Sequence, residues 1–271
     1  MRTRSVNIVR SRRRRASVIA VAWAAFAFPV GLSAAAYAAP PAAKPIDNRR
    51  QYNACMQLAR DKPSEAFEAA LSWKGLGGGD AAEHCVAVAL LGLGHHDEAA
   101  NRLEALASKT KENHAIKAGL LAQAAQAWLL SGKSERAEGV LTAALRLTPK
   151  DAALLVNRAE ARAGRKNYQG AVDDLTRAIA IEDRRPDAYV FRAAAYRYLD
   201  ELELAMADVE KALGLQPSHV DGLMERGILR RLKGDDAAAR RDWLEVLRLA
   251  PQSPAAESAR ANLEHMDVKR K

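Results

Sequence analysis

The sequence predicts an all-helical solenoid, because one pattern of small and apolar residues recurs every 34 residues without an insertion. The blocks begin at Ala118, Ala152, Pro186 and Val220, and together they cover residues 118–253. In each block the eighth and twentieth positions hold a small residue and the thirtieth is aliphatic. A period of this length is typical of repeats that bury their apolar face only by stacking on their neighbours. The chain shows no alternating pattern of the kind that marks strands.

Each block predicts two helices joined by a tight turn at its fifteenth position. The small residues at the eighth and twentieth positions let the two helices cross closely, and a proline at the thirty-second position of three blocks stops the second helix. Gly132 and Gly234 suit the turn, whereas Lys166 and Asp200 occupy the same position without glycine.

Residues 47–113 carry the pattern in weaker form, and we interpret them as two degenerate repeats. We expect helices from Asp47 to Arg60, from Pro63 onward, and in a block that starts near Asp80. Four extra residues then separate this block from Ala118.

Residues 254–271 predict a final amphipathic helix and a basic tail. Alanine, leucine and methionine residues fall on one side of Pro254–Met266. Such a helix covers the exposed end of the last repeat, which a solenoid needs for solubility.

The four blocks resemble the tetratricopeptide repeat family, which has a large apolar residue at position four and alanine at position twenty-seven. Position four is Leu121, Leu155, Tyr189 and Leu223. Position twenty-seven is Ala144, Ala178, Ala212 and Val246. The resemblance implies a right-handed solenoid of helix-turn-helix repeats. It also implies a concave groove, lined by the first helix of each repeat, that binds other proteins.

Residues 1–38 have the features of a secretory signal peptide. Seven arginines and no acid precede an uncharged stretch that ends in Ala36-Tyr37-Ala38, so we expect cleavage after Ala38 and export to the periplasm. The alternative is that the uncharged run stays uncleaved and anchors the protein, since about 20 apolar residues can span a bilayer. We interpret residues 39–46 as a Pro/Ala-rich linker.

The formal charge of +9 does not indicate a nucleic-acid partner. Removing the seven arginines of the signal from the 42 basic residues leaves 35, against 33 acidic residues, a net charge of +2. The basic excess therefore belongs mainly to the targeting segment.

The two cysteines, Cys55 and Cys85, predict a disulfide. An even pair in an exported chain is most simply bridged, and a loop of about 30 residues closed in this way stabilises by about 3 kcal/mol. The competing interpretation is a metal site that adds His84 and His95 or His96. Adjacent His84 and Cys85 point to different sides of a helix, so we expect no metal site.

No catalytic motif or cofactor motif appears, so we expect a protein that is not an enzyme and needs no cofactor. The glycine run at 75–79 is not preceded by a strand or followed by the Gly-Lys-Ser/Thr of a phosphate loop. Neither a nucleophile elbow nor a zinc-binding His-Glu-x-x-His helix is present.

A charge pattern predicts ion pairs within the repeats. Arginine occupies position seven and aspartate position twenty-three in three blocks, as Arg158 and Asp174, Arg192 and Asp208, and Arg226 and Asp242. The block at Ala118 has Ala124 and Val140 instead. Because both partners are lost together, we interpret the pairs as structural.

The family resemblance implies which residues line the groove. The candidates, all on first helices, are Gln123, Gln126, Asn157, Glu160, Phe191, Arg197, Tyr198, Met224, Glu225, Ile228 and Arg231. The Lys and Asn clamp with which some family members hold a C-terminal carboxylate is absent, because position five is Ala122, Val156, Val190 and Met224.

We expect the aromatic and aliphatic candidates to anchor a partner segment, and Arg197 and Arg231 to orient acidic or carbonyl-rich groups. The alternative is that some of these residues pack between repeats.

The repeats and the expected signal peptide are compatible with two functions. The first is a non-catalytic adaptor of the cell envelope that binds a segment of another protein. The second is a structural subunit of an envelope complex, held by an uncleaved anchor or by self-assembly. An enzyme or a metal carrier is a more distant third. The partner, the pathway and the oligomeric state stay open.

Overall fold

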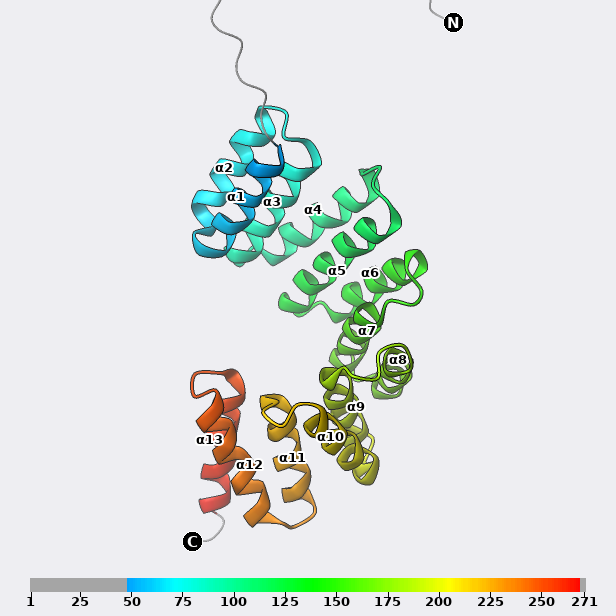
Figure 1. Cartoon of the computed structure of the whole chain (residues 1–271), viewed down its shortest axis with the longest axis vertical. Coiled ribbons are helices and arrows are strands. Elements are labelled where there is room, and N and C mark those ends of the chain that lie inside the picture. Colours follow the sequence, from blue (N-terminus) through cyan, green and yellow to red (C-terminus); the bar gives the residue numbers. More distant parts are fainter. Residues whose placement is uncertain (1–47, 269–271) are drawn as a thin grey trace, which may run out of the picture. The chain divides into compact units, whose positions relative to one another are not determined.

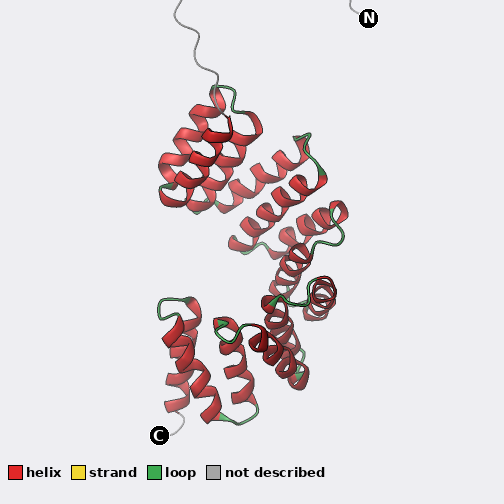
Figure 2. Ribbon diagram, in the orientation of Figure 1, coloured by secondary structure: helices red, strands yellow, loops and turns green. Residues whose placement is uncertain are grey.

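The computed structural model describes residues 48–268, and all thirteen of their secondary-structure elements are α-helices (Figures 1 and 2). The helices are α1 Asn48–Asp61, α2 Pro63–Gly75, α3 Gly79–Gly92, α4 His96–Lys109, α5 His114–Leu130, α6 Ser134–Leu147, α7 Ala152–Gly164, α8 Tyr168–Ile181, α9 Pro186–Tyr198, α10 Leu202–Leu215, α11 Val220–Leu232, α12 Asp236–Leu249 and α13 Pro254–Val268. The expected signal peptide (1–38) and linker (39–46) lie outside the described residues. None of the described helices is both long and apolar enough to cross a membrane.

The helices pack in consecutive pairs, as the 34-residue period predicts. Each odd-numbered helix from α1 to α11 packs against the even-numbered helix that follows it, and that helix packs against the next odd-numbered one. We call α1, α3, α5, α7, α9 and α11 the first helices and their partners the second helices. The first helices from α5 to α11 also contact one another in succession, as do α1 and α3. The all-helical solenoid is therefore confirmed.

The four extra residues before Ala118 belong to α5. They lengthen α5 at its N-terminus, so that this helix has 17 residues where α7, α9 and α11 have 13. Asn113 caps the added turn, its Oδ1 accepting a hydrogen bond from the Ile116 amide at 3.0 Å. α3 and α5 contact each other less than the other successive first helices do.

The turns at the fifteenth position all use the left-handed backbone region. Gly132 and Gly234 have φ of 74° and 85°, and Lys166 and Asp200 adopt φ of 62° and 64° in spite of their side chains. The repeat geometry therefore imposes this conformation on residues that disfavour it.

Three bidentate ion pairs join the two helices within repeats, as the charge pattern predicts. Arg158 donates from Nε and Nη2 to the Asp174 carboxylate at 2.8 and 2.7 Å, and Asp174 is 1% exposed. Arg192–Asp208 and Arg226–Asp242 repeat this arrangement. In the block at Ala118 the apolar side chains of Ala124 and Val140 are buried instead. Partial burial of the charges offsets much of their attraction, so the pairs fix geometry more than they stabilise.

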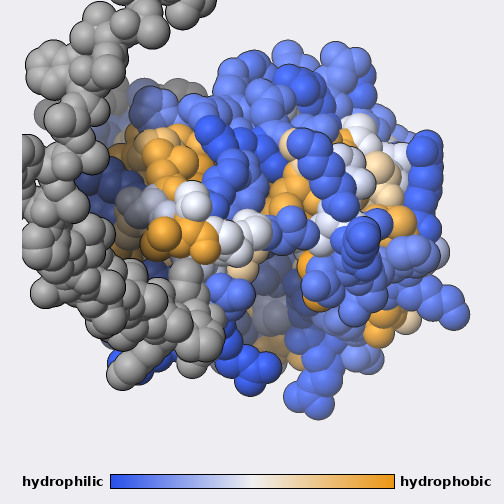
Figure 3. All heavy atoms as spheres, turned by 90° about the horizontal axis from the view of Figure 1, so that it is seen from above, coloured by the Kyte–Doolittle hydropathy of each residue, from blue (hydrophilic) through white to orange (hydrophobic). Residues whose placement is uncertain are grey.

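The final helix closes the stack as expected. α13 packs against α12 and α11 and buries Ala256, Ala259, Leu263 and Met266. On the face shown in Figure 3, the visible surface of the described residues is mostly hydrophilic, with apolar side chains in separate patches.

Candidate partner-binding surface

A cavity of about 470 Å³ opens between α1, α3, α5 and the connection from α4 to α5. We call it the α3–α5 cavity. Its lining residues are Tyr52, Asp80, Ala81, His84, Leu106, Thr110, Glu112, Ile116, Gly119, Leu120 and Gln123. Leu106, Ile116 and Leu120 are apolar lining residues, and Asp80 and Glu112 contribute two carboxylates.

Three polar side chains from successive first helices form a hydrogen-bonded chain in this cavity. Tyr52 Oη lies 2.7 Å from His84 Nδ1, and His84 Nε2 lies 2.8 Å from Gln123 Oε1. Because an amide oxygen only accepts, His84 Nε2 carries the proton and Nδ1 accepts from the Tyr52 hydroxyl. The two hydrogen bonds therefore join α1, α3 and α5 through the neutral imidazole of His84.

Burial favours this neutral state. Desolvation lowers the pKa of His84, and desolvation raises the pKa of the Tyr52 phenol. At neutral pH the hydroxyl is a donor to the imidazole, and the amide nitrogen of Gln123 keeps its two N–H groups for other acceptors.

The Cys55–Cys85 disulfide lies beside these hydrogen-bonded side chains. It joins α1 to α3 with a Cα–Cα distance of 6.2 Å, so the structure contains the bridge that the sequence predicts. Cys55 follows Tyr52 by one turn and Cys85 directly follows His84, so the bridge fixes the spacing of the two hydrogen-bonded side chains. Among the described residues, no group of three or more His, Cys, Asp or Glu side chains is arranged to hold a metal ion.

Sequence reasoning did not bring these residues together. It placed Gln123 in the groove and considered His84 only as a metal ligand. The signal in the sequence was the four-residue insertion before Ala118, which lengthens α5 and so departs from the regular repeat.

Of the residues expected in the groove, two aromatic side chains on α9 are exposed. Phe191 is 41% and Tyr198 58% exposed, and they lie seven residues apart on one side of the helix. Tyr198 stacks on Tyr168 of α8 with ring centroids 4.5 Å apart. Gln126 and Glu160 are also exposed, and Asn157 is half-buried.

The two arginines that were expected to orient a partner are instead bound within the protein. Arg197 donates to Glu225 from Nε at 2.6 Å and from Nη2 at 3.3 Å, which links α9 to α11. Arg231 donates to the carbonyl of Asn262 in α13 at 3.2 Å. Glu225 is only 6% exposed, so its expected place on the groove surface is wrong.

Met224 and Ile228 are half-buried and pack against the core formed by the last repeats. The alternative that some candidates pack between repeats therefore holds for these two. Their positions follow the family pattern, but α13 and the neighbouring repeats cover much of their surface.

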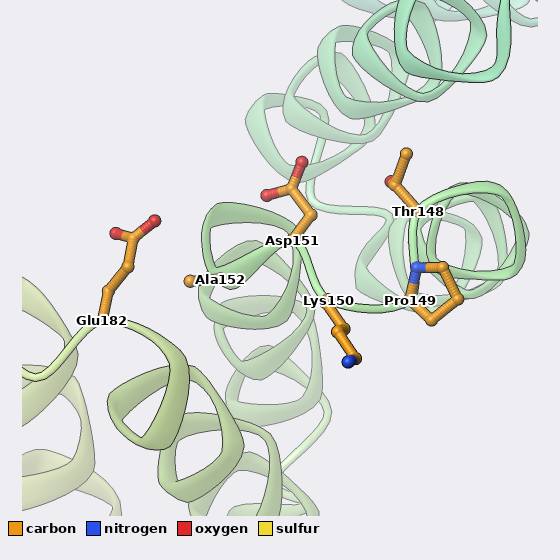
Figure 4. Close-up of a pocket in the computed structure, with 6 residues that line it drawn as sticks. All are labelled: Thr148, Pro149, Lys150, Asp151, Ala152 and Glu182. Carbon is orange, nitrogen blue, oxygen red and sulfur yellow. The ribbon is translucent and has the colours of Figure 1, made fainter.

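A larger open depression, of about 640 Å³, lies between the loops that precede α7 and α9 (Figure 4). Its residues are Thr148, Pro149, Lys150, Asp151, Ala152 and Glu182. Asp151 caps α7, accepting from the Leu154 amide at 3.1 Å, and Lys150 points away from the two carboxylates. These side chains serve the junction between repeats and do not converge on one point.

Comparison with known proteins identifies the repeat. The family model described as tetratricopeptide repeat matches residues 186–219, which is the third regular block. This chain is a tetratricopeptide repeat protein. The same 34-residue register extends over the other three blocks.

Curated relatives match parts of this tetratricopeptide repeat protein. The DnaJ homolog subfamily C member 7 homolog of Dictyostelium discoideum is 26% identical over 60% of this chain and 28% of its own length. Tetratricopeptide repeat protein 36 of Bos taurus is 35% identical over 29% of this chain and 44% of its own length. The chain thus spans less than half of either relative.

Solved structures share the fold. MamA from Desulfovibrio magneticus RS-1 gives a TM-score of 0.53 at 22% identity, over 64% of this chain and 95% of that one. The APC/C hetero-tetramer Cut9–Hcn1 gives 0.58 at 16% identity, over 79% of this chain and 45% of that one. At these sequence identities the similarity shows a shared fold and no more.

Proposed function

We propose that this tetratricopeptide repeat protein is a non-catalytic scaffold of the cell envelope, most simply in the periplasm, that binds a segment of another protein on its first helices. The observation that carries the proposal is the exposed pair of aromatic side chains on α9, Phe191 and Tyr198. Aromatic side chains contribute much of the binding energy at protein interfaces, and single truncations often cost about 2 kcal/mol.

The test is capture of partners from envelope extract by the exported protein. The variant Phe191→Ser with Tyr198→Ser should lose partners that the wild type retains, while its melting temperature stays close to wild type because neither side chain belongs to the buried core. The matched control is Leu204→Ser with Leu244→Ser, which removes two exposed apolar side chains from the second helices α10 and α12.

Loss of the same partners by the control would place binding on the second helices and contradict the proposal. The alternative function, a structural subunit held by an uncleaved anchor, would show as an intact signal segment and self-association in light scattering. In that case no soluble partner would depend on Phe191 or Tyr198.

A further inference from the structure

The charged side chains that line the α3–α5 cavity, Asp80 and Glu112, are both acidic, and Glu160 on the next first helix, α7, is acidic as well. Arg197 and Arg231 are bound within the protein, as described above. Asp80, Glu112 and Glu160 are exposed, and none of them has an ion-pair partner within the described part of the chain. Partial desolvation raises the pKa of the Glu160 carboxyl, with no nearby cation to oppose it. Lys111 and Lys117 are next to lining residues in the sequence, but neither of them lines the cavity.

The cavity is large enough for more than one side chain. Ligand sites in proteins commonly have volumes of about 300–1,000 Å³, and this cavity has about 470 Å³. Leu106, Leu120 and the 45% exposed Ile116 offer an apolar wall for an aliphatic side chain. Asp80 and Glu112 offer carboxylates in the same cavity.

The hydrogen-bonded chain leaves groups that suit a peptide backbone. Gln123 uses its oxygen for His84, so its amide N–H groups can donate to a carbonyl. Tyr52 donates its proton to His84, so its oxygen can still accept. A donor and an acceptor thus lie on opposite sides of the imidazole.

We propose that the α3–α5 cavity binds a segment of a partner protein in which an aliphatic side chain stands next to a lysine or arginine. The aliphatic side chain packs on Leu106, Ile116 and Leu120, and the cation pairs with Asp80 and Glu112. This proposal rests on the proposed function, because it names the chemistry of a segment that the scaffold takes. It reverses the expectation from sequence, in which arginines attract an acidic segment.

Gly119 provides a way to fill the cavity without disturbing the fold. It lines the cavity, and a Cβ built on it meets no atom within 4 Å. Gly119→Leu should therefore occupy the open space, and leucine is also a better helix former than glycine. Gly139→Leu on α6 is the matched control, because a Cβ there also meets nothing within 4 Å and α6 is a second helix.

The experiment selects binders from a random dodecapeptide library on the purified chain with its disulfide intact. We expect the selected peptides to share an aliphatic residue beside lysine or arginine. In fluorescence anisotropy the best of them should bind Gly119→Leu at least tenfold more weakly than wild type, and Gly139→Leu as well as wild type. Asp80→Asn with Glu112→Gln should weaken the basic peptide and leave its lysine-to-norleucine analogue unchanged.

Selection of acidic peptides, no enrichment, or full binding to Gly119→Leu would each overturn the proposal. A separate experiment, the capture of envelope partners, tests the proposed function. If Gly119→Leu still captures every partner that depends on Phe191 and Tyr198, the scaffold stands and the cavity is not its binding site.

Discussion

Gly227 and Trp243 fit each other because the indole occupies the space that a side chain at the eighth position would need. A Cβ built on Gly227 would lie 2.3 Å from Trp243 Nε1, and the ring is fully buried. We expect Gly227→Ala to lower the free energy of unfolding by about 1–3 kcal/mol in urea titration, since a rigid ring must shift. Gly214→Ala is the control, because a Cβ there meets nothing within 4 Å. Equal effects of the two variants would contradict this account.

His84 makes the stability of the first repeats depend on pH. Its pKa in the folded protein is lowered by desolvation from the ordinary value of 6.5, although Asp80 and Glu112 line the same cavity. Below about pH 6.5 the unfolded chain binds a proton that the folded chain does not, so stability falls as pH falls toward the lowered pKa.

Urea unfolding at pH 7.5 and 5.5 should therefore show a loss in wild type that is smaller in His84→Gln, by up to about 1 kcal/mol per pH unit. An identical pH dependence in the two proteins would mean that His84 does not titrate in this way.

At the scale of elements, the disulfide should hold α1 and α3 together without affecting distant repeats. Cys55→Ser with Cys85→Ser removes a constraint worth about 3 kcal/mol in the loop-entropy model. We expect faster amide hydrogen exchange in α1–α3 and unchanged exchange in α9–α12, because repeats couple mainly to their neighbours. Titration of the exported wild type without reductant should find no free thiol. Two free thiols, or faster exchange throughout the chain, would contradict the prediction.

At the scale of the whole molecule, we propose that residues 1–38 direct the protein to the cell envelope. We expect the exported protein to begin at Ala39 and to appear in the periplasmic fraction, with the intact mass of residues 39–271. A variant without residues 1–38 is the control and should stay in the cytoplasm. A full-length mass in the membrane fraction would instead support the uncleaved anchor.

The sequence predicted the parts of the fold that lie within one repeat. Arg158 and Asp174 meet because both positions belong to a single helix pair, whose geometry the 34-residue pattern fixes. The turns at Lys166 and Asp200 follow from the same register. Of the candidate surface, the exposure of Phe191 agrees with the family pattern.

Taken alone, the sequence determined the helix pairs, the capping helix and the ion pairs within repeats, because each depends on a short and regular spacing along the chain. Only the tertiary structure decided the contacts between repeats. Arg197 meets Glu225 in the next repeat, and Tyr52, His84 and Gln123 meet across three helices. These contacts depend on how far each repeat rotates on its neighbour. The added turn of α5 lies outside the 34-residue pattern, so the pattern does not predict its contacts.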